Sequence, residues 1–350
     1  MYSATPNRPT PSLSRIDFEA LPRAYGRPSA SGQIRSRAAD FIVTENLAFP
    51  LSGEGEHLYL RIRKTGQNTR WVAKQLAGRL GLSPRAVGFA GLKDRHAIAD
   101  QWFSLHLPGK PDPDLNALNI EGVEIIETMR HAAKLRIGAL AGNQFRIVVR
   151  NLQGRVTDLE ARLQKLRDRC VPNYFGPQRF GREGRNLDLL TGPAPDPACG
   201  REAKSFGLSA LRSALFNGYL AGRIEDQTWD RPLPGEIMRL EATGKFCHVD
   251  KLSAGASPAQ PTGLLWGLGQ NQATGKALER EREYFTRHLD VTAVLGAYGV
   301  RMVRRPLGMP VKRLAWTLDR DMLELEFNLT RGQYATAVLH EIVGFTEAMH

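Results

Sequence analysis

Alternating apolar and polar positions recur along the chain after residue 33. The segment 58–63 alternates leucine or isoleucine with tyrosine or arginine, which predicts a strand with one buried face and one basic face. The segment 144–149 places phenylalanine, isoleucine and valine on one side in the same way. Similar patterns predict further strands, over 34–43, 87–90, 102–105, 134–139 and 322–327. We therefore expect a sheet to which both ends of the sequence contribute.

An apolar repeat of three to four residues marks the predicted helices. The first begins at Asn68 or Thr69, where a capping side chain is available, and ends at Gly81. Further helices are expected over 155–169, 208–223 and 277–295, and a last helix passes through Val338 and Ile342. A hairpin is expected at 236–247. Helices and strands are thus segregated along the chain, which indicates an α+β fold.

The order of these elements predicts a domain inserted into another domain. A strand-rich beginning and a strand-plus-helix end flank a mixed middle, and the terminal segments must pair to complete one sheet. We expect one domain from 31–168 plus 310–350 and an inserted domain from 169–309. An irregular lead-in rich in proline, serine and arginine, 1–30, precedes them. Two sequential domains are the simpler alternative.

The chain is strongly basic, with 48 lysine and arginine residues against 36 aspartate and glutamate residues and a net charge of +12. A polyanion is the commonest partner of such a surface, and the basic residues are clustered, which favours nucleic acid over simple solubility. Solvated charged faces are the alternative interpretation. The candidate RNA-binding residues are Arg61, Arg63, Lys64, Arg70, Arg179, Arg182, Arg185, Arg304 and Arg305.

Several classes of protein are disfavoured by what the sequence lacks. It has no apolar run of bilayer length and no charged-then-apolar signal pattern at its beginning, so we expect no membrane association. Its three cysteines, Cys170, Cys199 and Cys247, are too scattered for a disulfide framework or a metal site. These observations predict a cytoplasmic protein without a bound metal.

The most unusual local sequence is the run 88–97, GFAGLKDRHA, which places Asp94 between Lys93 and Arg95 after a short apolar strand. Neighbouring cations stabilise the charged form of a carboxylate, and small residues beside it leave space for a substrate. From this run alone, an ion-paired loop aspartate is as good an interpretation as a catalytic one.

The same run resembles a signature of the TruD family of tRNA pseudouridine synthases. The resemblance is carried by 89–97 together with Gln101 and Trp102. More blocks agree in the family's order, at 40–43, 53–57, 61–64, 68–70, 142–145, 171–176, 178–181, 261–263, 266–267 and 335–338. They cover nearly the whole chain after residue 33, so the chain is identified as a member of this family.

The resemblance implies a pseudouridine-synthase-like domain with a mixed, mainly antiparallel sheet, an inserted α/β (TRUD) domain, and a cleft between them. It implies isomerisation of a uridine in tRNA, at position 13 of the D arm, without a cofactor. We further expect a monomer that needs no obligate protein partner.

The resemblance also assigns roles to individual residues of this chain. Asp94 takes the catalytic position, and Arg35 falls where the family has a basic residue. Phe41, Asn143 and Phe145 fall at positions of the uracil pocket, with Lys93 as a further substrate contact. Tyr334 stands where the family often has phenylalanine, which keeps an aromatic face but adds a hydroxyl. Without the resemblance, Phe41 and Phe145 would be interpreted as ordinary strand packing.

Two questions stay open at this point. Asp94 acts either as a nucleophile on the sugar carbon or as a base, and the sequence does not choose between them. Two other functions are weighed against the isomerase: a non-catalytic RNA-binding protein, and a metal-dependent nuclease using Asp94 and His96. The intact run around Asp94 argues against the first, and the lack of clustered carboxylates argues against the second.

Overall fold

The chain folds into two compact units in the computed structural model, which describes residues 17–115, 118–191, 200–252 and 258–348. We call Pro28–Asp168, Val311–Gly332 and Ile342–His350 the sheet unit. We call Met1–Arg27, Arg169–Pro310 and Gln333–Glu341 the helical unit. The segment Gln333–Glu341 thus groups with 169–310, although the sequence had placed all of 310–350 in one domain. Cys199 and the first part of the expected lead-in, 1–16, lie outside the described residues.

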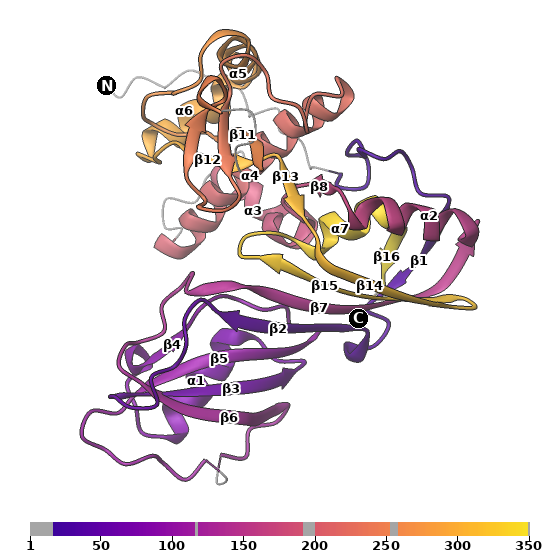
Figure 1. Ribbon diagram of the computed structural model, residues 1–350. Coiled ribbons are helices and arrows are strands. Elements are labelled where there is room, and N and C mark those ends of the chain that lie inside the picture. Colours follow the sequence, from indigo (N-terminus) through magenta and orange to yellow (C-terminus); the bar gives the residue numbers. More distant parts are fainter. Residues whose placement is uncertain (1–16, 116–117, 192–199, 253–257, 349–350) are drawn as a thin grey trace, which may run out of the picture. The chain divides into compact units, whose positions relative to one another are not determined.

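A ten-stranded sheet forms the body of the sheet unit (Figure 1). Its strands are β1 (Ala30–Ile34), β2 (Phe41–Leu47), β3 (His57–Thr65), β4 (Val87–Phe89), β5 (Ile98–His106), β6 (Val123–His131), β7 (Leu140–Gly154), β14 (Lys312–Asp319), β15 (Met322–Thr330) and β16 (Gly344–Glu347). The main order is β14-β15-β7-β2-β5-β3-β6, while β1 pairs with β7 and β16, and β4 pairs with β5. Only the pairs β2 with β5 and β1 with β16 are parallel among these ladders. The sheet is therefore mixed and mainly antiparallel, which confirms the expected fold class.

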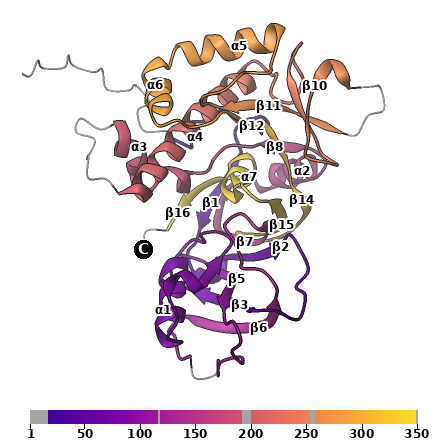
Figure 2. The same cartoon turned by 90° about the vertical axis from the view of Figure 1, so that its left-hand side faces the viewer.

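Two helices pack on this sheet. Helix α1 (Thr69–Arg79) is capped by Asn68, one of the two caps predicted from the sequence, whose side chain accepts a hydrogen bond from the Arg70 backbone N–H. Its buried residues Val72 and Leu76 join the alternating leucines and isoleucine of β3 and Phe103 of β5 in one apolar core. Helix α2 (Val156–Arg167) buries Leu159, Leu163 and Leu166. Figure 2 shows α1 lying along one face of the strands β3 and β5.

The expected strand over 34–43 is in fact two strands with a turn between them. β1 ends at Ile34, and Arg35 then adopts a left-handed backbone conformation with φ of 58°. A short 3₁₀ turn over Ala38–Asp40 precedes β2. Left-handed backbone is disfavoured for a residue with a Cβ, so the surrounding structure must hold Arg35 in place. The apolar alternation was continuous across this turn, which hid it from the sequence analysis.

A second correction concerns the edge of the sheet. The expected strand over 134–139 is an irregular connection, and the edge strand is β6 (Val123–His131), which the sequence analysis missed. Five of the nine residues of β6 are exposed, Glu124 and Glu127 among them, so it lacks the apolar alternation of a half-buried strand. Polar edge strands of this kind discourage sheet-to-sheet association.

The helical unit combines helices with two small sheets. Its helices are α3 (Arg185–Thr191), α4 (Arg201–Glu225), α5 (Gly275–Thr286), α6 (Leu289–Ala297) and α7 (Ala335–Ile342), the last ending one residue beyond the unit. β9 (Ile237–Leu240), β10 (Phe246–His248), β11 (Ala259–Leu265) and β12 (Val303–Pro306) form a sheet in the order β10-β9-β11-β12, and β8 (Cys170–Pro172) pairs with β13 (Gly308–Pro310). The predicted hairpin at 236–247 is confirmed as β9 and β10.

The predicted long helix over 277–295 is two helices, α5 and α6. The chain leaves helical geometry at His288, with φ of −126° and ψ of 37°. Neither proline nor glycine lies at this break, so the sequence gives no local reason to expect it.

The described part of the lead-in is irregular but closely bound to α7. Arg23 donates from Nε to the backbone carbonyl of His340 over 2.8 Å, and the backbone N–H of Ala24 donates to Glu341 over 2.9 Å. The carbonyl of Leu21 lies 3.1 Å from Nε2 of His340. Burial lowers the pKa of His340 to about 3, with a smaller contribution from Arg23, so the ring is neutral at physiological pH.

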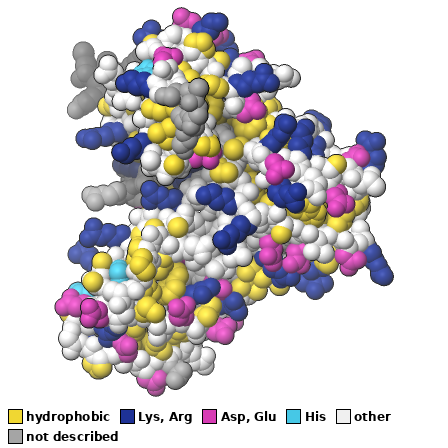
Figure 3. Space-filling view, in the orientation of Figure 1, with side chains coloured by type: hydrophobic (Ala, Val, Ile, Leu, Met, Phe, Trp, Pro, Cys, Tyr) yellow, Lys and Arg dark blue, Asp and Glu magenta, His cyan; other side chains and the backbone are white. Residues whose placement is uncertain are grey.

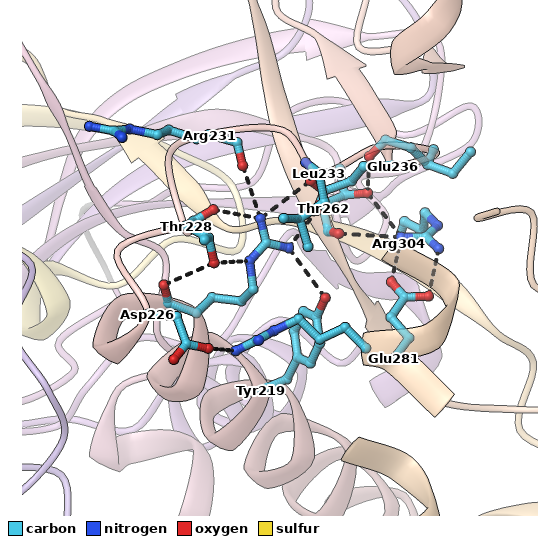
Figure 4. Close-up of polar contacts among 12 residues, drawn as sticks. Tyr219, Asp226, Thr228, Arg231, Leu233, Glu236, Thr262, Glu281 and Arg304 are labelled. Atoms are coloured by element: carbon cyan, nitrogen blue, oxygen red, sulfur yellow. Dashed lines mark hydrogen bonds and ion pairs between the residues drawn. The ribbon is translucent and has the colours of Figure 1, made fainter. Parts of the chain in front are cut away.

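Buried ion pairs hold the helical unit together (Figure 4). Arg223 of α4 is fully buried and forms an ion pair with Glu236 over 2.7 Å, while its guanidinium also donates to the carbonyls of Thr228 and Arg231. In the same unit, Arg304 of β12 pairs with Glu281 of α5 over 2.9 Å. Charges taken out of water are tolerated only when they are paired and hydrogen-bonded in this way.

We predict that Arg223→Met destabilises the helical unit strongly. The Glu236 carboxylate would remain buried without its cation, which costs about 3–5 kcal/mol of unfolding free energy. The measurement is urea unfolding followed by circular dichroism. The matched control is Arg287→Met, which removes an exposed ion pair with Glu283 and should cost no more than about 1 kcal/mol. Equal losses in the two variants would contradict this account of the buried pair.

Candidate active site

Asp94 lies in the loop between β4 and β5 of the sheet unit, and its carboxylate is partly open to solvent. Its side chain is 39% exposed, and Oδ2 accepts a hydrogen bond from Nη2 of Arg35 over 2.7 Å. Among the described residues, Oδ1 has no protein hydrogen-bond partner. One carboxylate oxygen is therefore held, and the other is available to a ligand.

Arg35 is the buried cation of this site. Its Nη1 donates to Glu347 of β16 over 2.7 Å, so one guanidinium joins two carboxylates. Its Cζ lies 4.4 Å from the centre of the Phe41 ring, in cation–π geometry. The left-handed backbone at Arg35 directs the side chain to this position between β1 and β2. The fold thus brings together Arg35 and Asp94, the two residues that the resemblance assigned to the catalytic site.

Lys64 anchors the backbone of the Asp94 loop. This lysine of β3 is fully buried, and its Nζ donates to the carbonyls of Asp94 over 2.9 Å and of Gln67 over 2.8 Å. Burial lowers the pKa of Lys64 to about 8, against the opposing effect of the Asp94 charge. Lys64 was expected to contact RNA, but its ammonium is enclosed, so we assign it to the support of the loop.

Lys93, the residue before Asp94, is also enclosed. Its Nζ forms an ion pair with Glu45 of β2 over 2.5 Å, and both side chains are buried. The other Glu45 oxygen accepts from the Trp102 backbone over 3.0 Å. Lys93 was expected to contact substrate, yet its charge is already neutralised by Glu45. In this structure it fixes the loop to β2.

Gln101 and Thr69 complete the support of the loop. Oγ1 of Thr69 accepts from the Lys93 backbone N–H over 3.0 Å and donates to Oε1 of Gln101 over 2.9 Å. Nε2 of Gln101 donates to the Gly91 carbonyl over 2.7 Å. The Gly91 carbonyl and the Lys93 N–H are therefore both bonded to buried side chains, which fixes the loop in place.

The expected uracil-pocket residues of the sheet unit lie on β2 and β7. Phe41 is 3% exposed and Phe145 is 7% exposed, and their rings meet edge to face at 6.1 Å. Phe327 stacks on the far side of Phe145 at 5.5 Å. Asn143 is paired in register with Glu45, and its Oδ1 is buried with no hydrogen-bond partner among the described residues. The phenylalanines are closely packed here, while Asn143 offers an unsatisfied acceptor.

Tyr334, the remaining expected pocket residue, belongs to the helical unit. Its ring contacts Phe175 edge to face at 5.7 Å, and Cζ of Arg179 lies 5.9 Å from its centre. Arg179 also donates to Ser209 over 2.9 Å. Aromatic rings and a cation thus cluster around Tyr334 within this unit.

The expected RNA-binding arginines fall into two groups. Arg304 and Arg305 are engaged inside the helical unit: Arg304 pairs with Glu281, and Arg305 stacks over Phe175 at 4.0 Å and bonds to Asn173. Burial lowers the pKa of Arg305, although an arginine stays protonated at neutral pH. These two side chains are structural, and we no longer assign them to RNA.

The second group is more accessible. Arg70, Arg182 and Arg185 are exposed, and Arg185 has only a loose ion pair of 3.8 Å with Glu183. Arg63 is bidentate with Asp100 at 2.8 and 3.0 Å, and Arg61 lies 3.5 Å from Glu127, so both are partly neutralised. On the face shown in Figure 3, lysine and arginine side chains are interspersed with acidic ones.

Within the described ranges, no group of three or more histidine, cysteine, aspartate or glutamate side chains is arranged to hold a metal ion. No described helix is both long and apolar enough to cross a membrane. Cys170 and Cys247 are free thiols.

Comparison with known proteins identifies the family. The sequence profile of tRNA pseudouridine synthase D (TruD) matches residues 20–191 and 200–342. The chain belongs to the TruD family. A tRNA pseudouridine synthase D of Methylococcus capsulatus is 44% identical over 337 residues, covering 94% of this chain and 95% of that protein. One from Hydrogenovibrio crunogenus is 40% identical, covering 95% of this chain and 96% of that protein.

A solved structure shows the same fold. The Methanosarcina mazei protein assigned as a tRNA pseudouridine synthase D matches with a TM-score of 0.69 at 22% identity, covering 92% of this chain and 95% of that chain. The family assignment made from the sequence is therefore confirmed, and with it membership of a family of tRNA-modifying isomerases.

Sequence reasoning missed the residues that support the TruD-family loop. Glu45, Thr69 and Gln101 lie near or inside blocks that carried the resemblance, but nothing in their spacing shows that their side chains meet. Glu347 gave no signal, because β16 itself was not expected. These contacts depend on strand register, which only the folded chain defines.

We predict that Thr69→Val slows the reaction of this TruD-family protein, because the loop loses both hydrogen bonds of Oγ1. Misplacement of a catalytic group by a fraction of an ångström to about 1 Å costs about 10- to 100-fold in rate. The measurement is the single-turnover rate of pseudouridine formation, with tRNA affinity measured separately. Thr69→Ser keeps the hydroxyl and should retain most of the rate. Equal loss in both variants would show that packing, rather than the hydrogen bonds, is what matters at this position.

Proposed function

We propose that this TruD-family protein converts the uridine at position 13 of tRNA, in the D arm, to pseudouridine, with Asp94 as the catalytic carboxylate. The observation that carries the proposal is the state of that carboxylate: partly exposed, on an anchored loop, with Oδ2 held by Arg35 and Oδ1 available. An aspartate that served only as a structural ion-pair partner would not need such an anchored loop around it.

The reaction is an internal rearrangement. The bond between uracil N1 and ribose C1′ breaks, the base turns, and C5 bonds to C1′, while a proton leaves C5 and N1 gains one. No atoms are added and no net oxidation or reduction occurs, so the chemistry requires no cofactor. Asp94 takes part as an ionised group, and the positive charge of Arg35 stabilises and orients it.

The target base must leave the RNA to reach Asp94, at a cost of roughly a few kcal/mol. We propose that Asn143 helps to offset this cost by accepting a hydrogen bond from the uracil edge. Its buried Oδ1 has no partner in the described chain, and a buried acceptor without a partner is costly. Phe41 and Phe145 would form the apolar floor of the pocket.

We propose that the accessible arginines bind the phosphates of the tRNA. Arg70, Arg182 and Arg185 are exposed, and Arg61, Arg63 and Arg179 have partial contacts that phosphate can replace. Because Asp94, Arg35, Lys64 and Lys93 all come from the sheet unit of one chain, we propose a monomer acting on cytoplasmic tRNA, without an obligate protein partner.

Asp94→Asn is expected to leave tRNA binding nearly intact and to lower the single-turnover rate by more than about 100-fold, because an amide is neither a nucleophile nor a base. The measurement pairs a filter-binding titration with tritium release from C5-labelled tRNA. The matched control is Asp158→Asn, a surface position on α2 that should react at the normal rate. Retained turnover by Asp94→Asn would remove Asp94 from the mechanism. Salt-sensitive tRNA binding without product by the unaltered protein would instead indicate RNA binding alone.

The site of modification is tested in cells. Mapping pseudouridine in tRNA from cells with and without this protein should show loss at position 13 only when the protein is absent. An unchanged position 13, with a loss at another uridine, would contradict the substrate assignment while leaving the reaction type in place.

A further inference from the structure

Leu92 is a large apolar side chain that is exposed beside the candidate catalytic residue. It is 49% exposed, and it lies two residues before Asp94. Phe89, the last residue of β4, packs instead against Phe103 of β5.

The backbone on both sides of Leu92 is fixed. The carbonyl of Gly91 accepts from Gln101 over 2.7 Å, and the N–H of Lys93 donates to Thr69 over 3.0 Å. The Lys93 side chain is bound to buried Glu45. Leu92 therefore projects from a rigid support, and its exposure does not result from a loose loop.

The short distance along the chain keeps Leu92 close to Asp94. A chain spans at most about 3.6 Å per residue, so the Cα atoms of Leu92 and Asp94 are within about 7 Å of each other. A nucleotide whose sugar reaches Asp94 stays bonded to its neighbours on both sides. The RNA stack that it leaves must therefore lie about one nucleotide length from the carboxylate, which is within reach of Leu92.

We propose that Leu92 enters the gap left in the RNA stack when the target uridine is extruded. This proposal rests on the proposed function and adds the step that precedes the chemistry. Proteins that unstack nucleic acids insert apolar side chains, leucine among them, between bases. Such a side chain gains burial against the neighbouring bases and keeps the extruded nucleotide from returning.

The neighbouring side chains of the loop are unsuited to this role. Lys93 is enclosed in its ion pair with Glu45, and Arg95 donates from Nε to the carbonyl of Gly66 over 3.0 Å. Asp94 carries a negative charge, which the phosphates of RNA repel. Leu92, by contrast, is uncharged, apolar and accessible. Arg95, on the other side of Asp94 in the sequence, is exposed and can contact phosphate.

The test separates extrusion from chemistry. Extrusion is followed by the fluorescence of 2-aminopurine placed beside the target uridine, in complexes with the Asp94→Asn variant, with and without Leu92→Ala. Loss of the Leu92 side chain should lower the equilibrium constant for extrusion about 10-fold, since this side chain fills the gap and so offsets part of the unstacking cost. The single-turnover rate of Leu92→Ala alone should fall by a similar factor.

Two variants control for changes in folding and for the loss of any exposed apolar side chain. Leu92→Met conserves volume and apolar character, so it should stay within about 3-fold of the normal rate. Ile126→Ala removes an exposed apolar side chain from the edge strand β6 and should change neither readout.

The proposal is overturned by a full fluorescence change with Leu92→Ala, even if the rate falls, since the substitution would then act on the loop rather than on the stack. It is equally overturned if Leu92→Ala changes neither readout, or if it changes only the sedimentation behaviour, which would assign the side chain to a protein contact. Absence of pseudouridine formation by the unaltered protein would instead count against the proposed function, and the fluorescence arm would still decide the role of Leu92.

Discussion

The ion pair between Arg35 and Asp94 is the interaction on which the site depends. Arg35 is held from two sides, by Glu347 of the C-terminal strand and by the ring of Phe41, and it reaches Asp94 with the remaining arm of its guanidinium. β1 and β16, from opposite ends of the chain, pair in parallel to place Arg35 and Glu347 side by side. The strained backbone at Arg35 is thus a consequence of building the site where the two termini of the sheet unit meet.

The remaining polar groups near Asp94 hold the loop backbone in position. Lys64, Lys93 and Glu45 would be costly to bury without partners, but Lys93 and Glu45 pair with each other and Lys64 donates to the Asp94 carbonyl. Thr69 and Gln101 bond to each other and bind the Lys93 N–H and the Gly91 carbonyl. Such support keeps Asp94 and Leu92 in position before RNA arrives, so little ordering is left for the moment of binding. The helical unit uses the same principle in its own core, where Arg223 and Arg304 are paired with glutamates.

Much of the fold and of the candidate site could be predicted from the sequence, because local patterns indicate the helices and strands and the family blocks indicate the site residues. The start of α1 at Asn68 or Thr69 and the strand β3 followed from local patterns, and the family resemblance singled out Asp94 and Arg35. Basic clusters were less informative. They locate positive charge but not its partners, so Lys64, Arg304 and Arg305 looked like RNA contacts although they are bonded inside the protein. The turn at Arg35 and the strands β6 and β16 depend on long-range pairing, which no local pattern contains.

The central claim is that Oδ1 of Asp94 is the protein atom that an extruded uridine reaches. The most direct measurement is a crystal structure of the protein bound to tRNA carrying 5-fluorouridine at the target position, where fluorine prevents the loss of a proton from C5 and so retains the nucleotide. The account predicts that the nucleotide is out of the RNA stack, with its ribose C1′ or its base in contact with Oδ1 of Asp94 while Arg35 stays bonded to Oδ2. A uridine bound elsewhere, with Asp94 touching only Arg35, would contradict it.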